Sequence, residues 1–286
     1  GHLCGEVAGM RVFEPALRQL RPGRWSVFGP TSFRRYLEEN GLDSRRVDTA
    51  AHISVDSLDD LAPELREAGA MVLRLGRATD GPGTQFAIVG TPGRVEDFFL
   101  VDEEICTHED PEVYHPQSDP WELLPYYLLP RLTERCMVHL AFASGLMGHA
   151  LGLDRPWPTS APAMGAGTFS LTVVPYPGAA ALEHTAGQVE IDALFVGRRR
   201  GKETVFVVES KTGPASSLAK HKLVYAARAV EPRLGATPLV PVYLRCEDRG
   251  STVKFDVVEC TGWECELTEI QALKHRRLLL DLGAVI

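Results

Sequence analysis

The sequence predicts an α/β protein whose mixed central sheet is flanked by helices, with an N-terminal α/β domain in front of it. Three observations favour this class. Strand-like and helical patterns alternate along the 286 residues, as is typical of a sheet covered by helices. Residues 187–212 have the pattern of two strands joined by a short basic turn. The composition, 44% hydrophobic and 24% charged, is that of a globular protein with ample material for a core.

A proline-broken acidic stretch marks the expected domain boundary. Residues 108–121 read H-E-D-P-E-V-Y-H-P-Q-S-D-P-W, which is typical of a loop or linker. We therefore expect two domains, residues 1–115 and 116–286. The first would serve target recognition or assembly, because it contains no recognisable set of catalytic residue types.

The first domain is expected to mix helices and strands. Serine or threonine precedes each expected helix and glycine follows it. The helices would run between Ser32 and Gly41 and between Ser57 and Gly69, and the strands would cover residues 71–75, 85–89 and 98–101.

The second domain begins with the longest helical pattern in the chain. Residues 128–151 are apolar nearly all round, so we expect a helix buried against the sheet. Prolines 238 and 241 predict that the first part of one later strand lies at an edge or bulge. The expected order is strand 168–174, the hairpin, helix 217–230, strands 238–244 and 252–258, and a closing helix 267–282.

The hairpin carries the chemistry. Glu190 and Asp192 alternate with apolar residues, so they leave one face of the first strand. Residues 205–210 are apolar on both faces until the end, as in a strand inside a sheet. Glu209 and Lys211 are two apart and share a face. Pairing of the two strands can therefore bring Asp192 beside Glu209 and Lys211.

Two carboxylates beside an ammonium group favour metal-assisted hydrolysis. Adjacent carboxylates resist joint ionisation unless a cation neutralises them. Carboxylate oxygens suit Mg²⁺ or Mn²⁺, which also accept phosphate oxygens. Such an ion lowers the pKa of a bound water, and a lysine can orient that water or offset charge at phosphorus. The trio therefore indicates cleavage of a phosphodiester.

These residues resemble a known signature. Asp192 followed by Glu209-Ser210-Lys211 is similar to the D…(D/E)-x-K motif of the PD-(D/E)XK, or restriction-endonuclease-like, nuclease superfamily, over about residues 165–260. The resemblance implies a restriction-endonuclease-like core and an endonuclease that cleaves DNA with Mg²⁺ or Mn²⁺. Asp192 and Glu209 would bind the metal, and Lys211 would lie next to the attacking water. Ile191 stands where the motif has proline.

The resemblance extends to the flanking helices. One branch of the superfamily carries Q-x-x-x-Y after the motif, where this chain has H-K-L-V-Y at 221–225, which leaves open whether His221 or Lys222 faces the site. Glu134, the only acid in the long helix, is a candidate metal ligand, unless it contacts Arg131 or Arg135 at the surface. Glu190 would either bind the metal itself or contact the residues that bind it. The expected phosphate or nucleic-acid contacts are His221, Lys222, Lys220, Arg199 and Tyr225.

Other interpretations stay open. The strand-end charges can be a solvated hairpin end in which Glu209 pairs with Lys211. The same fold also occurs in RNA-directed nucleases and in non-catalytic nucleic-acid-binding or assembly proteins, although an intact trio favours catalysis. Members of the superfamily often dimerise, so the resemblance allows a homodimer. The role that we expect first is restriction or phage defence, and the second is DNA repair.

The charge distribution is uneven. The net charge of −8 opposes general nucleic-acid binding. Residues 161–286, however, hold 15 basic and 14 acidic residues, against 15 and 24 in the first 160. The basic residues gather at 198–202, 220–222 and 274–277, either as solvated surfaces or as one surface that follows a phosphate backbone.

The cysteines and hydropathy indicate a cytoplasmic protein. Six cysteines without a C-x-x-C pair predict reduced thiols inside the cell. No apolar window is long enough to span a bilayer, so we expect no membrane association.

Overall fold

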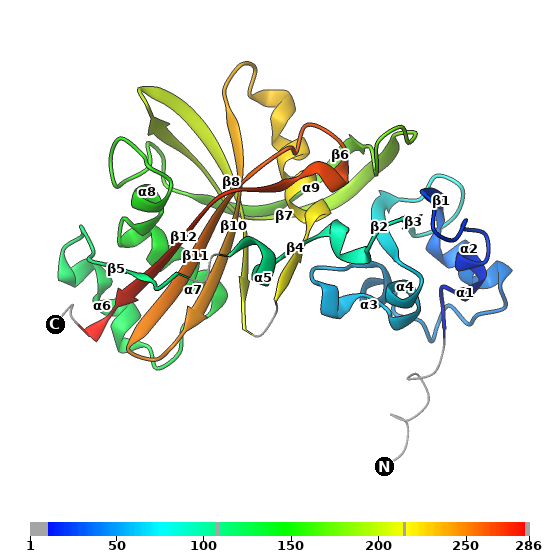
Figure 1. Cartoon of the computed structure of the whole chain (residues 1–286), viewed down its shortest axis with the longest axis horizontal. Coiled ribbons are helices and arrows are strands. Elements are labelled where there is room, and N and C mark those ends of the chain that lie inside the picture. Colours follow the sequence, from blue (N-terminus) through cyan, green and yellow to red (C-terminus); the bar gives the residue numbers. More distant parts are fainter. Residues whose placement is uncertain (1–10, 107–108, 214–215, 284–286) are drawn as a thin grey trace, which may run out of the picture.

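The computed structural model describes residues 11–106, 109–213 and 216–283, and it is a mixed α/β protein (Figure 1). Its main sheet follows the order β1-β3-β2-β7-β8-β10-β11-β12-β5, with β6 attached to β7. The sheet contains both parallel and antiparallel pairs and is flanked by helices. The predicted fold class is therefore confirmed at this level.

The first part of the chain contains the elements α1 (Glu14–Leu17), β1 (Ser26–Ser32), α2 (Phe33–Glu39), α3 (Thr49–Ile53), η1 (Leu58–Asp60), α4 (Pro63–Glu67), β2 (Ala70–Arg77), β3 (Thr84–Gly90), η2 (Val95–Phe98), β4 (Phe99–Val101), α5 (Asp102–Ile105) and β5 (Glu112–Tyr114). The three predicted strands are confirmed as β2, β3 and β4. The first predicted helix is α2, because the Ser32 hydroxyl accepts a hydrogen bond from the Arg35 N–H at 3.2 Å. Strand β1 was not predicted.

The second part contains α6 (Pro120–Leu128), α7 (Glu134–Ala143), α8 (Leu146–Ala150), β6 (Ala163–Val173), β7 (Leu182–Arg199), β8 (Lys202–Thr212), β9 (Ser217–Ala219), α9 (Lys220–Val230), η3 (Glu231–Arg233), β10 (Leu239–Asp248), β11 (Thr252–Thr261), η4 (Leu267–Glu269) and β12 (Gln271–Asp281). Among the described residues, no helix combines the length and the apolar character needed to cross a membrane.

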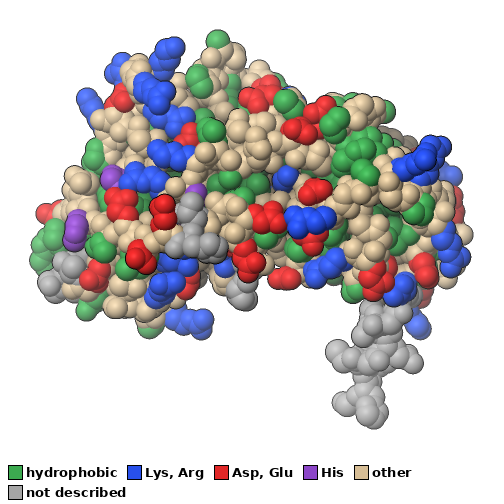
Figure 2. Space-filling view, in the orientation of Figure 1, with side chains coloured by type: hydrophobic (Ala, Val, Ile, Leu, Met, Phe, Trp, Pro, Cys, Tyr) green, Lys and Arg blue, Asp and Glu red, His purple; other side chains and the backbone are tan. Residues whose placement is uncertain are grey.

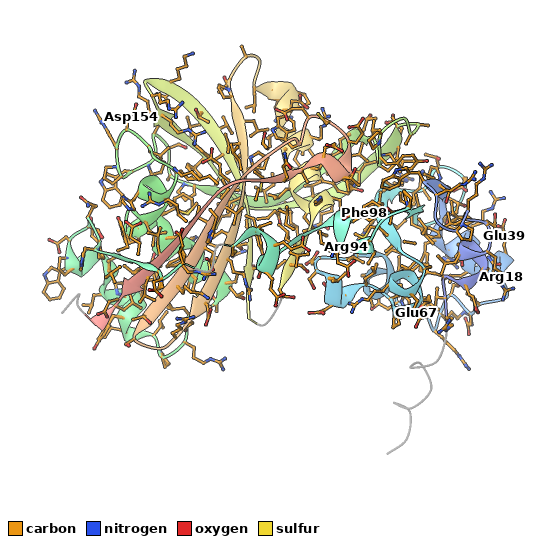
Figure 3. All side chains as sticks on the ribbon, in the orientation of Figure 1. Arg18, Glu39, Glu67, Arg94, Phe98 and Asp154 are labelled. Atoms are coloured by element: carbon orange, nitrogen blue, oxygen red, sulfur yellow. The ribbon has the colours of Figure 1, made fainter. Side chains whose placement is uncertain are left out.

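The β7–β8 hairpin is confirmed. Its two turn residues, Arg200 and Gly201, have φ values of 54° and 73°, as a tight hairpin turn requires. The Asp154 carboxylate accepts hydrogen bonds from both of their N–H groups, at 2.8 and 2.9 Å (Figure 3). Lys and Arg side chains gather at this end of the molecule (Figure 2). Arg198 and Lys202, on either side of the turn, are exposed.

Strands β7 and β8 separate before either of them ends. Their pairing runs from Arg199–Lys202 to Ala193–Val208. Residues 182–192 of β7 continue beside β6, with one pair to β2. Residues 209–212 of β8 continue beside β10 instead. The sheet therefore opens where the sequence places Asp192 and Glu209.

The two faces of the sheet have different covers. Helices α6, α7 and α8 pack on the face that includes Phe206 and Val208. Helix α9 and the N-terminal elements pack on the opposite face, which includes Val207 and Tyr243. Because side chains alternate along a strand, Ser210 follows the α7 face and Glu209 follows the α9 face.

The predicted long helix 128–151 is wrong as a single element. Helix α7 begins at Glu134, where the Thr133 hydroxyl accepts a hydrogen bond from the Cys136 N–H at 3.3 Å. It ends before Gly145, whose φ of 77° is a left-handed conformation that favours glycine and stops a helix. A continuous apolar pattern therefore hides a change of direction.

The predicted closing helix 267–282 is also wrong. After η4, these residues form strand β12, which pairs with β11 on one side and β5 on the other. The apolar run Leu278–Leu280 fits either structure locally, and the open edge of β11 decides for the strand. Helix α9 likewise starts at Lys220 and not at 217, because Ser217–Ala219 pair with β4.

The predicted edge position of the first part of β10 is confirmed, with Pro238 just before the strand and Pro241 inside it. Strand β10 pairs with β8 from Leu239 onward, but with β11 only from Val242 onward. Residues 239–241 therefore have a strand partner on one side, and Pro241 lacks only an N–H that the ladder does not need there.

Two leucines of β12 separate the strand from the predicted helix. Leu273 and Leu280 are seven residues apart and would share one face of a helix, whereas in β12 Leu280 is 0% exposed and Leu273 is 66% exposed. We expect Leu280→Ala to lower the unfolding free energy by about 2–5 kcal/mol, and Leu273→Ala to change it by less than about 0.5 kcal/mol. Urea denaturation of both variants is the measurement, and equal effects would contradict the strand.

Candidate active site

Asp192 spans the gap between the separating strands. Its Oδ2 accepts hydrogen bonds from the Ser210 N–H at 2.7 Å and from the Ser210 hydroxyl at 3.0 Å. The backbone of β8 is thus bonded to a side chain of β7 just beyond their last paired residues. This contact fixes the carboxylate at the opening of the sheet.

Glu134 approaches the same serine from the α7 face. Its Oε1 lies 3.2 Å from the Ser210 hydroxyl, and its Oε2 accepts from the Thr212 hydroxyl at 3.1 Å. The Ser210 hydroxyl has one proton for two carboxylates, Glu134 and Asp192, so it satisfies one of them at a time. Among the residues that the structure describes, no ion pair joins Glu134 to Arg131 or Arg135.

Glu209 lies on the opposite face and is buried. It is 3% exposed, and none of the described groups donates to its Oε1. Burial raises the pKa of this carboxyl well above its usual value, and the nearby Asp192 adds to the rise, whereas Lys222 and Lys211 lower it. A buried oxygen without a donor is a position for a cation or a proton.

Asp56 is the charged partner of both lysines. Its two carboxylate oxygens lie 3.0 Å from the Lys211 Nζ and 3.3 Å from the Lys222 Nζ. Burial raises the pKa of Asp56, but Lys222 and Lys211 outweigh it, so that the pKa falls below its usual value. The Asp56 carbonyl also accepts from the Ala219 N–H at 2.7 Å, and this bond fixes the loop.

Lys222, and not His221, faces the carboxylates. Burial lowers the pKa of Lys222, but the charges of Glu209 and Asp56 raise it above its usual value. His221 is 5% exposed and has no acidic hydrogen-bond partner among the described residues. Of the two residues, Lys222 is the one whose side chain forms an ion pair with an acid of the cluster.

Some of the residues expected to contact nucleic acid lie elsewhere. Arg199 binds Glu259 at 2.7 Å near the hairpin turn, seven residues from Asp192 along β7, or roughly 23 Å at ~3.3 Å per residue. Lys220 donates to the Thr268 carbonyl at 3.0 Å. Neither joins the charged cluster, because long-range contacts hold both side chains.

Two cavities adjoin the cluster. One, of about 440 Å³, includes Glu134, Asp192 and Ser210 in its wall. The other, of about 270 Å³, includes Asp56 and Lys222. Glu190 is exposed and borders both cavities. The first cavity therefore borders the split itself at Asp192 and Ser210, and the second borders the lysine side of the cluster.

The charge balance of the cluster fits a divalent cation. Its buried and half-buried carboxylates outnumber its ammonium groups by four to two. The four acids are Glu134, Asp192, Glu209 and Asp56, and the two bases are Lys211 and Lys222. Ionisation of all four would leave two uncompensated negative charges in a site where carboxylate oxygens are the available ligands. Hard ions such as Mg²⁺ or Mn²⁺ prefer these ligands.

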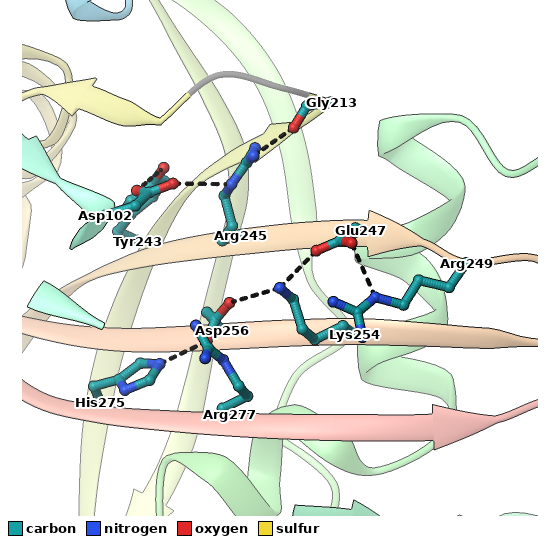
Figure 4. A network of polar contacts seen from close by, with 10 residues as sticks. All are labelled: Asp102, Gly213, Tyr243, Arg245, Glu247, Arg249, Lys254, Asp256, His275 and Arg277. Atoms are coloured by element: carbon teal, nitrogen blue, oxygen red, sulfur yellow. Dashed lines mark hydrogen bonds and ion pairs between the residues drawn. The ribbon is translucent and has the colours of Figure 1, made fainter. Parts of the chain in front are cut away.

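A second polar network lies farther along the α9 face of the sheet, over β10, β11 and β12 (Figure 4). Asp256 accepts from His275 and from Arg277, both at 2.7 Å. Donor atoms of Cys106, Asp256 and His275 lie within 4.8 Å of one another, the spacing of a possible metal site. The Arg277 guanidinium already neutralises the carboxylate, however, and a thiol is a poor ligand for Mg²⁺.

Arg245 of β10 lies beside Lys211 but has its own acidic partner. It is opposite Lys211 in the parallel register of β8 and β10, and its Nε lies 3.0 Å from an Asp102 carboxylate oxygen. The Tyr243 hydroxyl donates to the other oxygen of Asp102 at 2.9 Å. Since Asp102 pairs with Arg245, Lys211 is left to Asp56.

Sequence reasoning missed Asp56 altogether. The sequence around it, V-D-S-L-D-D, signals the start of a helix, which explains the short η1 but gives no sign of a distant partner. Its contact with Lys211 joins residues that are 155 positions apart. Ser210 was part of the motif, but its role in joining Asp192 to Glu134 depends on helix α7.

Comparison with known proteins identifies a family. Residues 118–276, more than half of the chain, match the family described as Domain of unknown function (DUF6997). The chain therefore belongs to this family. No curated protein and no solved structure matches the chain. The matched residues include every charged member of the cluster except Asp56.

The raised pKa of Glu209 predicts a pH effect on stability. Between the unfolded pKa of about 4.3 and the higher folded pKa, the folded protein keeps a proton that the unfolded chain releases. Wild-type stability should therefore fall as pH rises through this interval, by up to about 1.4 kcal/mol per pH unit from this group, relative to Glu209→Gln.

Thermal melting of the two proteins in EDTA, from pH 4 to 8, measures the difference. The melting curves should agree near the acid end and separate toward neutral pH, with Glu209→Gln the more stable. A constant difference across the range would mean that Glu209 titrates as a solvated carboxylate.

Proposed function

We propose that this protein is a metal-dependent endonuclease that hydrolyses phosphodiester bonds of DNA. The observation that carries the proposal is the buried Glu209 carboxylate, whose Oε1 none of the described groups bonds, beside Asp192, Lys211 and Lys222 at the opening of the sheet. A carboxylate with a purely structural role normally has hydrogen-bond donors at its buried oxygens. The buried Oε1 of Glu209 has none among the described groups, so a cation or a proton can occupy that position.

The arrangement of elements supports a restriction-endonuclease-like core. Helix α7, which carries Glu134, precedes the first strand β6, and helix α9 packs against the sheet after the motif strand β8. This is the order that the resemblance to the PD-(D/E)XK superfamily implies. The trio of Asp192, Glu209 and Lys211 is intact, which favours catalysis over a binding role alone.

The residues suggest distinct roles. Asp192, Glu209 and Glu134 would hold Mg²⁺ or Mn²⁺, with Glu190 at the exposed rim. The bound ion supplies a Lewis acid and a water of lowered pKa. Lys211 would orient that water, and Lys222 would bind an oxygen of the scissile phosphate. Both ammonium groups need a new anionic partner when they leave Asp56, and a phosphate is one.

Loss of Lys211 should separate catalysis from metal binding. We expect Lys211→Ala to lower the rate of cleavage by at least about 100-fold while the carboxylates still bind metal. Asp192→Ala should abolish cleavage and also weaken Mn²⁺ binding. Lys202→Ala, on the exposed far end of the same strand, is the matched control and should cut at the wild-type rate.

Purified protein incubated with plasmid, single-stranded DNA and RNA, in Mg²⁺, Mn²⁺ or EDTA, gives the readout, and calorimetry with Mn²⁺ gives the affinity. Cleavage of RNA alone would transfer the proposal to an RNA-directed nuclease. If no nucleic acid is cut with either metal, or if both site variants cut at the wild-type rate, the proposal is wrong.

Asp56 should compete with the phosphate for the two lysines. We expect Asp56→Asn to raise affinity for single-stranded DNA in EDTA by roughly tenfold, because a charge that neutralises Lys211 and Lys222 is gone. Fluorescence anisotropy measures the change, and Asp59→Asn, exposed on the neighbouring η1, is the control. A loss of affinity would show instead that Asp56 holds the lysines in place for the phosphate.

A further inference from the structure

The cavity of about 270 Å³ on the α9 face has a composition that phosphate binding does not explain. It lies between strand β7, helix α9 and the loop that carries Asp56. Lys222 and Asp56 belong both to its wall and to the charged cluster. A group that occupies this cavity would therefore be directly beside a phosphate bound at Lys222.

Three rings form one part of the wall. The ring centroids of His184 and Tyr225 are 5.0 Å apart, and those of His221 and Tyr225 are 5.2 Å apart. The Tyr225 hydroxyl donates to the Arg74 carbonyl at 3.0 Å, which fixes the central ring. The rings are 2–7% exposed, so they form the buried inner end of the wall, and a planar ligand that enters the cavity would meet aromatic side chains there.

His221 lines the cavity and has a buried ring nitrogen to which none of the described groups is hydrogen-bonded. The residue is 5% exposed, and its Nδ1 has no partner among the described residues. Burial lowers the pKa of the imidazole to about 3, with Lys222 adding to the effect. The ring is therefore neutral, with one nitrogen that donates and one that accepts a hydrogen bond. Buried polar atoms of this kind normally have a partner.

The outer part of the wall carries groups that recognise the edges of bases. Gln188 of β7 and Arg74 of β2 are both exposed and line the cavity. The Arg74 Nη1 donates to the Ser54 hydroxyl at 2.9 Å, which leaves other N–H donors of the guanidinium for a ligand. Amide and guanidinium groups are the side chains that pair with base edges.

We propose that this cavity receives one unstacked nucleobase of the strand whose phosphate lies at Lys222. The inference rests on the proposed function. A base would place its flat surface near the rings and its polar edge toward His221, Gln188 or Arg74. An inorganic anion would leave the rings and the neutral imidazole without a role.

Abasic substitution tests the proposal. Labelled single-stranded DNAs, each lacking the base at one position, are titrated with wild-type protein in EDTA and followed by anisotropy. We expect the loss of one particular base to weaken binding by about tenfold, while loss of the others has a smaller effect. Equal affinity for all of the DNAs, abasic or complete, would overturn the inference.

A double variant assigns the effect to this cavity. Arg74→Ala with Gln188→Ala should bind complete DNA about tenfold more weakly and should no longer respond to the abasic position. Arg77→Ala, another exposed arginine of β2 that does not line the cavity, should behave like wild type. A double variant that keeps the full abasic response would place the base elsewhere and overturn the inference.

Cleavage in Mg²⁺ separates the two proposals. If wild type cuts DNA but shows no abasic response, the base-binding inference fails and the proposed function stands. If wild type shows the response and cuts neither DNA nor RNA, the cavity binds a base in a protein that is not a nuclease.

Discussion

A carboxyl group buried at the end of a strand is the constraint around which this structure is arranged. Glu209 lies inside the interface between the sheet and helix α9, with its Oε1 bonded to none of the described groups. Such a group must be protonated or must have cations nearby. The lysines supply that charge from two elements, Lys211 from β8 and Lys222 from α9. Asp56 then supplies the anion that both of them face.

The separation of β7 and β8 leaves an opening in the sheet at the carboxylates. A fully paired sheet would close over the carboxylates, whereas here the two strands diverge after the Ala193–Val208 pair. Asp192 spans the gap through Ser210, and Glu134 reaches the same serine from α7. Acids from both faces of the sheet therefore meet at one opening.

The N-terminal part of the chain contributes to the site although the family match begins at residue 118. Asp56 faces both lysines, and Arg74 borders the cavity beside them. The hydrophobic core on the α9 face includes residues from both parts of the chain, such as Leu65 and Leu223. The division at residue 115 remains a prediction, while the site itself draws on residues from either side of it.

Local sequence patterns determined the hairpin, most of the strands and the spacing of Glu209 and Lys211. Alternation of side chains, turn chemistry at Arg200–Gly201 and capping at Ser32 act between near neighbours, so one sequence is enough to predict them. Tertiary structure decided the rest. The open edge of β11 made residues 271–281 a strand, and helix α7 ends before Gly145, where Tyr114, Pro156 and Trp157 leave little room for a side chain. Contacts between residues distant along the chain bring Asp56 to Lys211 and set the position of Lys222. Such contacts also hold Arg199 and Lys220 away from the site. Local propensity cannot predict such contacts, because they form and contribute free energy only when the elements pack together.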